Sequence, residues 1–512
     1  MTALWSNPEF IRNVRAQLRP GKIIATACIC AAISIATGFA ISRVDRAAAG
    51  PFGWASELFQ VAVWLQALML AAGGGIACIN SIYREKEQNT FDYQRVTQLT
   101  PLELALGKLL GAPIFTYFVF LCLMPLAIFG AVMGKARVSA VLGAYAVLLV
   151  GSLATHVLAL LISLLTVRGS HTGAILLLLV LLWGASFSGP NLQFFQVGSF
   201  GPFYAAQVAE RASWNSSTVT ARGGTYEIPG TTDVFFGQSV HHVPVFLAVD
   251  LLFAGWFLLA VVRNIKRDPN YYEVYSPMQA LGFAMFINLL FVAFFRWQSS
   301  TPVDSQAYLL ALNIGVFFCL GLAVIRNRER ARRILRAREG VGANWLDVTW
   351  PAPLLAAGTL AAGLLVVAGV AQGRGPQGEW SAGLAVFRSL FFVAWLVRDM
   401  QFLQWMSLRR GKHALAIGVL FLVIFYVCVN IMMTAFGLFT MPERTPFSAF
   451  FVPSPVFLLD YTAWALRPAI WGAAFVAQWV LIATFIGLQK QTIDELNSPA
   501  KSSVPDAAPA YL

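Results

Sequence analysis

The sequence predicts an all-α protein that crosses a membrane many times, and three observations lead to this prediction. Of its 512 residues, 58% are hydrophobic and only 12% are charged, about half the charged share of an average soluble domain. Apolar runs near 20 residues long recur along the chain, and about 20 residues of helix cross ~30 Å of hydrocarbon. The 36 Lys and Arg residues exceed the 24 Asp and Glu residues, and they gather in the polar segments between the runs.

The apolar runs predict twelve spanning helices. The runs that begin at Ala174 and Ala382 are short, so one of them could be re-entrant or broken. Those that begin at Leu104 and Ala414 are long enough to tilt in the bilayer. The twelve predicted spans are Ile23–Ile41, Leu58–Ile82, Leu104–Val132, Ala140–Leu165, Ala174–Phe187, Val243–Val262, Met278–Phe295, Ala307–Ile325, Ala352–Ala371, Ala382–Val397, Ala414–Phe439 and Ala469–Leu488.

Positive charge orients the chain, because Lys and Arg are retained on the cytoplasmic side. With cytoplasmic termini, twelve spans place most Lys and Arg inside, including the seven arginines of Arg326–Arg338. An odd number of spans before that block would put it outside. The net charge of +12 therefore indicates topology and contact with anionic lipid. It does not indicate nucleic acid as a partner, since no folded basic domain carries it. We expect a multi-pass protein of the cell (inner) membrane.

The residues before the first span predict an amphipathic helix on the inner membrane surface. Asn7 is a favourable helix cap, and Pro8 suits the first helical position. An ordinary solvated helix is the alternative to a membrane-surface helix. Apolar residues at helical spacing are Phe10, Ile11, Val14 and Leu18, and the other face carries Arg12, Arg15, Gln17 and Arg19.

A polar stretch, "REKEQNTFDYQRVTQLTPLELALGK" from Arg84 to Lys108, separates two of the most apolar runs. Its first residues predict a polar extension of the second span. Thr100-Pro101-Leu102-Glu103 has the pattern of a capping box, which would start the third helix at Thr100. The segment Thr90–Leu99 between them has too little apolar surface to form a domain, so we expect it to contact another molecule.

With "NPEF" before an amphipathic helix and a six-span layout, this stretch resembles the permeases of type-2 ATP-binding-cassette (ABC) exporters. The resemblance covers Met1–Val262 and is weak beyond it. It implies that the loop 83–103 docks on a separate ATP-hydrolysing subunit, which binds the ATP. Asn89 stands where the family usually has glycine. The positions that match the family, and are expected at the partner contact, are Glu85, Glu87, Thr90, Thr100, Pro101 and Lys108, with Gly107 completing the Gly-Lys pair.

The second half of the chain has the layout of a degenerate copy of the first. Its largest inner loop, Arg326–Pro351, again follows the second span of the set, but it lacks the Glu-x-x-Thr pattern. We therefore expect two six-span halves, 1–265 and 266–490, followed by a flexible cytoplasmic tail, 491–512. The unit would be a pseudo-dimer within one chain.

Two charged residues lie well inside predicted spans, Asp250 and Arg388. A charge at mid-membrane costs roughly 2.5–3.5 kcal/mol on insertion scales. The two residues either pair with each other or line a substrate path. The six cysteines all fall in spans and show no disulfide framework or metal-ligand spacing.

The motifs of catalysis are missing from the sequence. None of the four Gly-Lys pairs is followed by Ser or Thr, so no phosphate-binding loop is expected. The interpretation that fits best is a permease subunit, itself not an enzyme, without a cofactor or metal of its own, that exports an unidentified substrate. The alternatives are a twelve-span secondary transporter driven by an ion gradient and a membrane-embedded enzyme.

Overall fold

The computed structural model divides into two units, Met1–Val274 and Tyr275–Leu512, which are described separately. It describes residues 6–43, 53–166, 202–203, 205, 208–209, 218–221, 224–227, 232–235, 238–267, 272–294, 325–326, 328–337, 382–409, 414–435 and 468–497. The predicted spans that begin at Ala174, Ala307 and Ala352 lie outside these residues, except for Ile325 at the end of the second of them. Of the predicted tail 491–512, residues 491–497 belong to the helix Pro468–Asn497, and those from 498 onward lie outside the described residues.

The described residues are predominantly helical, and six of their helices are long and apolar enough to cross a membrane. These six are Pro20–Ser42, Trp54–Glu87, Pro101–Met133, Val138–Leu165, Val243–Asn264 and Gly472–Leu496, and Met278–Leu290 and Ala414–Cys428 are shorter apolar helices. The chain is a multi-pass membrane protein. The predicted total of twelve spans and the repeat stay predictions.

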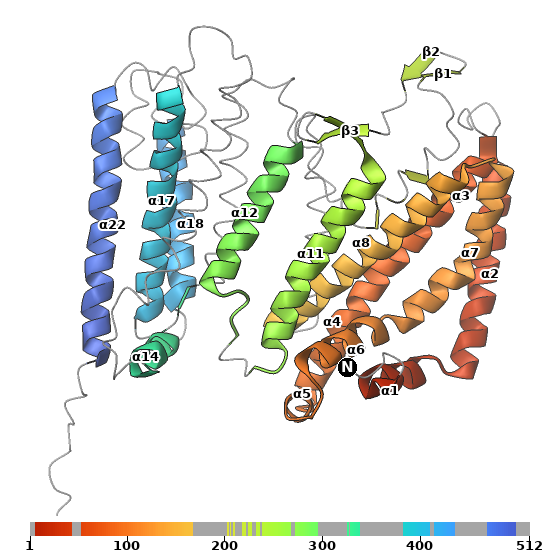
Figure 1. Cartoon of the computed structure of the whole chain (residues 1–512), viewed down its shortest axis with the longest axis horizontal. Coiled ribbons are helices and arrows are strands. Elements are labelled where there is room, and N and C mark those ends of the chain that lie inside the picture. Colours follow the sequence, from red (N-terminus) through yellow and green to blue (C-terminus); the bar gives the residue numbers. More distant parts are fainter. Residues whose placement is uncertain are drawn as a thin grey trace, which may run out of the picture. The chain divides into compact units, whose positions relative to one another are not determined.

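The first unit is a bundle of long helices with the short helices α1 and α5 at one end (Figure 1). α8 packs against α11 and α4, α3 packs against α7, and α1 packs against α6. The helices of this unit are α1 (Pro8–Gln17), α2 (Pro20–Ser42), α3 (Gly53–Leu68), the π-helix η2 (Met69–Gly74), α4 (Gly75–Glu87), α5 (Phe91–Arg95), α6 (Pro101–Gly111), α7 (Ile114–Met133), α8 (Val138–Leu165) and α11 (His242–Asn264).

The π-helix η2 interrupts the second predicted span where the sequence runs Ala-Ala-Gly-Gly-Gly. The carbonyl of Leu70 in η2 accepts a hydrogen bond from Nε2 of the buried His156, at 2.8 Å. Because a carbonyl only accepts, Nε2 carries the proton, and in a neutral ring Nδ1 accepts from the Tyr117 hydroxyl at 3.1 Å. A Cβ at Gly74 would lie 2.1 Å from that Nε2. The glycine therefore lets α8 approach closely.

Two short antiparallel hairpins precede α11, and the all-α prediction did not include them. β1 (Thr218–Ala221) pairs with β2 (Gly224–Glu227), with Thr218 opposite Glu227. β3 (Thr232–Phe235) pairs with β4 (Gln238–His241), with Thr232 opposite His241. The β1–β2 hairpin lies at the end of this unit opposite to α1 and α5 (Figure 1).

The second unit contains α12 (Pro277–Phe294), α14 (Arg328–Ala337), α17 (Ala382–Leu408), α18 (Ala414–Ala435) and α22 (Pro468–Asn497). α17 packs against both α22 and α18. α17 continues the predicted span Ala382–Val397 by three turns. α14 packs across one end through Ala331 and Leu335, which contact Leu408 and Ile493.

A buried polar network joins α17, α18 and α22 of this unit. Arg398 of α17 donates to Oδ1 of its neighbour Asp399 at 2.7 Å and to Gln478 of α22 at 2.7 Å. The Tyr426 hydroxyl of α18 donates to Asp399 and accepts from Arg398. This network was not predicted from the sequence, because the predicted span Ala382–Val397 stopped one residue before Arg398.

Candidate functional site

The polar stretch singled out in the sequence forms the loop at one end of the first unit. It comprises the last turn of α4, the short helix α5 and the first turn of α6 (Figure 1). α1 lies at the same end of the unit. The spatial arrangement of these four pieces defines the candidate site.

α4 ends in a Schellman turn at Asn89. The Asn89 amide donates to the carbonyl of Lys86 at 3.2 Å, and the Thr90 amide donates to the carbonyl of Glu85 at 2.9 Å. Asn89 has φ 55°, in the left-handed region. That region favours glycine, and asparagine is among the few other residues that visit it routinely. The asparagine thus suits the turn in which the resembling family has glycine.

One face of α5 is anchored to the rest of the unit. Phe91 is buried at 2% exposure. Nη2 of Arg95 donates to the Tyr272 hydroxyl at 2.6 Å, and Nζ of Lys266 donates to the carbonyl of Thr97 at 2.7 Å. The segment after α11 therefore holds both the helix and the chain that leaves it.

The opposite face of α5 is exposed and partly apolar. Tyr93 is 75% exposed and Val96 is 81% exposed. Val96 is the C-cap of α5 and follows Tyr93 by three residues, so the two side chains are neighbours. The side chain of Asp92 beside them is 76% exposed. An aromatic and an aliphatic side chain presented from an anchored helix form a small, preorganised contact surface.

α6 begins at the capping box that the sequence predicts. The Thr100 side chain accepts from the Glu103 amide at 3.2 Å, and the Glu103 carboxylate accepts from the Thr100 amide at 2.9 Å. Pro101 occupies the first turn. The start of the third span is thereby fixed at Thr100, as predicted.

A buried ion cluster lies beneath the loop, formed by Glu9, Arg12, Glu85 and Lys108. Nζ of Lys108 lies 2.5 Å from Oε2 of Glu85 and 3.1 Å from Oε1 of Glu9. Nη2 of Arg12 lies 2.5 Å from Oε1 of Glu85 and 2.8 Å from Oε1 of Glu9. The Lys108 side chain is fully buried and that of Arg12 is 53% exposed. Two cations and two carboxylates make the cluster neutral.

The ion cluster fastens α1 to α4 and α6, and hydrogen bonds extend the contact. Nδ2 of Asn7 donates to the carbonyl of Glu103 at 2.8 Å, while Nε2 of Gln17 donates to the carbonyl of Ala112 at 2.8 Å. A Cβ at Gly107 would lie 2.8 Å from Cβ of Glu9. α1 therefore docks closely on α6. Asn7 also caps α1 through its own side chain, as predicted.

The predicted contact residues separate into two groups. Glu85 and Lys108 are buried in the ion cluster, where Glu85 also accepts from Gln94 at 2.6 Å. Their carboxylate and ammonium groups hold the fold of this chain, which the sequence did not indicate. The exposed members are Glu87, Thr90 and Thr100, and Pro101 is half-buried.

The segment Thr90–Leu99 was predicted to contact another molecule, but its exposed residues Asp92, Tyr93 and Val96 were not singled out. The helical spacing of Tyr93 and Val96 was visible in the sequence, but which face is anchored was not.

Asp250 is buried on α11 with 2% exposure. Arg388 lies on α17, in the other unit, and its side chain is outside the described residues. Both alternatives for these two residues, pairing with each other or lining a substrate path, stay predictions.

Electrostatic shifts at the site follow from burial and from neighbouring charge. Lys86 stands one residue before the end of α4, and its side chain is partly buried. Nζ of Lys86 donates to the carbonyls of Ser163, Leu164 and Thr166 at the end of α8. Burial disfavours the charged form of Arg12, but the charges of Glu9 and Glu85 outweigh it and raise its pKa.

Within the described parts of the chain, no group of three His, Cys, Asp or Glu side chains could hold a metal ion. The chemistry of the loop is that of a contact surface: charge, hydrogen bonds and two exposed apolar side chains.

The fold and this site define a multi-pass helical membrane protein with a structured polar loop between its second and third spans. Comparison with known proteins adds no narrower class: no family model, curated protein or solved structure matches the chain.

Proposed function

We propose that this chain is the membrane-spanning permease subunit of an ABC exporter, driven by a separate ATP-hydrolysing subunit. The observation that supports the proposal is the two-faced character of α5. Its anchored face includes Phe91 and Arg95, and its exposed face presents Tyr93 and Val96. A helix held this way can transmit a displacement of a bound partner to the spans on either side of it.

The ion cluster supports the same proposal, because it couples the helices around the loop to one another. Because Lys108 bonds both Glu85 and Glu9, the helices on both sides of the loop and α1 are tied together. A partner that moves α5 would then move the ends of α4, α6 and α1 as one body. The end of the unit that carries α1 and α5 would face the cytoplasm, in agreement with the charge distribution of the sequence.

The experiment is co-purification of the tagged chain with an ATPase subunit encoded beside it, followed by transport and ATP-hydrolysis assays. Glu87→Arg reverses an exposed charge next to α5, and Tyr93→Ala with Val96→Ala removes the apolar contact. Both should leave the insertion and expression of the chain unchanged. Each should weaken ATPase capture and abolish ATP-driven transport, since reversing or truncating one side of an interface costs several kcal/mol of association.

Arg43→Glu is a matched control for the charge reversal, because Arg43 is exposed at the far end of α2. Glu339→Arg, in the loop Arg326–Pro351 of the second half, should weaken ATPase capture and transport less than Glu87→Arg does. A Glu87→Arg protein that still captures the ATPase and still exports would overturn the proposed contact.

A second candidate function is a secondary transporter, and the network of Arg398, Asp399 and Tyr426 favours it. Buried charges among apolar helices often mark proton or ion paths. Within that network, however, the Asp399 carboxylate bonds both Arg398 and Tyr426, a pattern typical of a structural pair. Transport that follows a proton or sodium gradient without ATP would establish this alternative.

A further inference from the structure

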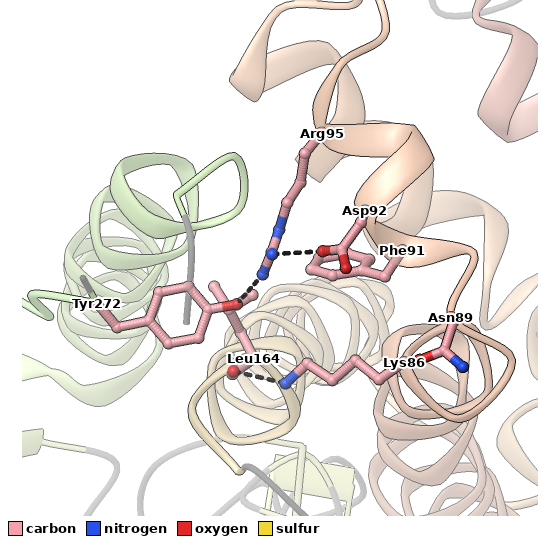
Figure 2. Close-up of a pocket in the computed structure, with 7 residues that line it drawn as sticks. All are labelled: Lys86, Asn89, Phe91, Asp92, Arg95, Leu164 and Tyr272. Carbon is pink, nitrogen blue, oxygen red and sulfur yellow. Dashed lines mark hydrogen bonds and ion pairs between the residues drawn. The ribbon is translucent and has the colours of Figure 1, made fainter. Parts of the chain in front are cut away.

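A small pocket of about 180 Å³ lies beside α5 (Figure 2). It is formed by the end of α4, the turn after it, α5, the end of α8 and the segment after α11. Its lining residues are Lys86, Asn89, Phe91, Asp92, Arg95, Leu164 and Tyr272.

The lining of this pocket carries a net positive charge. Lys86 and Arg95 supply two cations, and Asp92 is the one acidic lining residue. Nζ of Lys86 donates all three of its hydrogen bonds to carbonyls at the end of α8. It therefore contributes positive charge to the pocket but has no donor left for a ligand. The Asp92 carboxylate is mostly exposed, which weakens its influence inside the pocket.

Arg95 brings an unsatisfied donor to the pocket. Its Nη1 donates to Asp92 and its Nη2 to the Tyr272 hydroxyl, both at 2.6 Å (Figure 2). Its side chain is only 10% exposed, and its Nε is buried without a hydrogen-bond partner among the described residues. Buried donors are nearly always paired, and leaving one unpaired costs about 1–3 kcal/mol. An acceptor bound in the pocket would remove this cost.

We propose that the pocket binds a phosphate group, either free in solution or on a lipid headgroup, which accepts a hydrogen bond from Nε of Arg95. Arginine is the side chain best suited to phosphate oxygens, and the second cation is already in place. The volume equals that of roughly six waters at ~30 Å³ each, which is enough for such a group. Asn89 lines the same pocket with an amide that can donate as well.

Occupancy would tie α5 to the ends of α4 and α8 and to the segment after α11. The bound anion would therefore stiffen the loop that carries Tyr93 and Val96. This property belongs to the chain alone, and its test needs no partner subunit.

The first test is a titration of the full-length protein with inorganic phosphate at constant ionic strength, with chloride as the balancing anion. Binding is read from the rise in the thermal unfolding midpoint. Arg95→Gln should weaken phosphate binding at least about tenfold, which is the loss of one charge-assisted hydrogen bond. Arg84→Gln is the control, because Arg84 is exposed near the end of the neighbouring helix α4 and does not line the pocket. It should bind as the parent protein does.

Two further variants keep the test decisive even if Arg95→Gln does not fold. Asp92→Asn removes the acidic lining residue and should tighten binding by about threefold, because it removes one repulsion at an exposed site. Asn89→Gly keeps the left-handed turn, removes one donor and should weaken binding. Phosphate affinities that are equal in Asp92→Asn, Asn89→Gly and the parent would overturn the proposal.

A second test, in nanodiscs of different lipid composition, distinguishes a lipid headgroup from free phosphate as the ligand. If the site takes a headgroup, phosphatidic acid should raise the unfolding midpoint above that in phosphatidylcholine, and Arg95→Gln should abolish the difference. If the site takes a free anion, inorganic phosphate should raise the unfolding midpoint in nanodiscs that contain only phosphatidylcholine. A pocket that holds only water would give neither effect beyond that of chloride, and the inference would be wrong.

Discussion

Replacing Lys108 by methionine tests whether the buried ion cluster holds the first unit together. Nζ of Lys108 is fully buried and contacts carboxylates of both Glu85 and Glu9. Its removal leaves two carboxylates with the half-exposed Arg12, so the cluster changes from neutral to a net charge of −1. Removing one partner of a buried pair costs about 3–5 kcal/mol. We expect a loss near 3 kcal/mol, since Arg12 still compensates in part and methionine fills the space.

The assay is a double-mutant cycle with Lys108→Met, Glu85→Gln and the double variant. The free energy of unfolding of each protein is measured in detergent, with tryptophan fluorescence as the signal. In the double variant Glu9 and Arg12 remain as a neutral pair. The double loss should therefore fall short of the sum of the single losses by about 1 kcal/mol or more. Hydrogen exchange in α1 should accelerate in Lys108→Met, because α1 would lose its link to α6.

Arg84→Gln serves again as the control, with little expected change at this exposed position. Additive single losses, or a Lys108→Met protein as stable as Arg84→Gln, would refute the reasoning.

Three further predictions follow from the described contacts. Gly74→Ala should cost about 1–3 kcal/mol of stability, because its methyl group would displace His156 from the Leu70 carbonyl; an unchanged unfolding midpoint would contradict this close approach. Asn89→Val should cost about 1–2 kcal/mol and Asn89→Gly little, because the position is left-handed; equal stabilities of the two variants would speak against the Schellman turn. Cysteines placed in Ser213–Gln238 should react with impermeant reagents from outside and those in Arg328–Gly342 only from the cytoplasm; the reverse pattern would exclude the twelve-span topology.

Much of the local structure of the loop could be predicted from the sequence. The Asn7 cap and the Thr100–Glu103 capping box depend on residues within one turn of each other, and both are present as predicted. Length and hydropathy likewise located the described spans, because a helix in hydrocarbon needs no distant partner for its backbone.

The sequence was less informative where a residue's role depends on what packs against it. Glu85 and Glu87 are two residues apart and look equivalent in the sequence. In the structure Glu85 is buried among Arg12, Gln94 and Lys108, while Glu87 is exposed. The difference arises because α1 docks on α6 and brings its charges beneath one side of α4.

The sequence by itself determined that this chain is a membrane protein of many helices, that α1 and α6 begin at their caps Asn7 and Thr100, and that a polar loop separates the second span from the third. These properties depend on neighbours along the chain. Only the tertiary structure decided which loop residues support the fold and which face outward. Lys108 contacts a carboxylate 99 positions away, and Arg95 contacts a hydroxyl 177 positions away. Such contacts depend on how the helices assemble, because a local sequence pattern carries no information about which distant side chain will meet it.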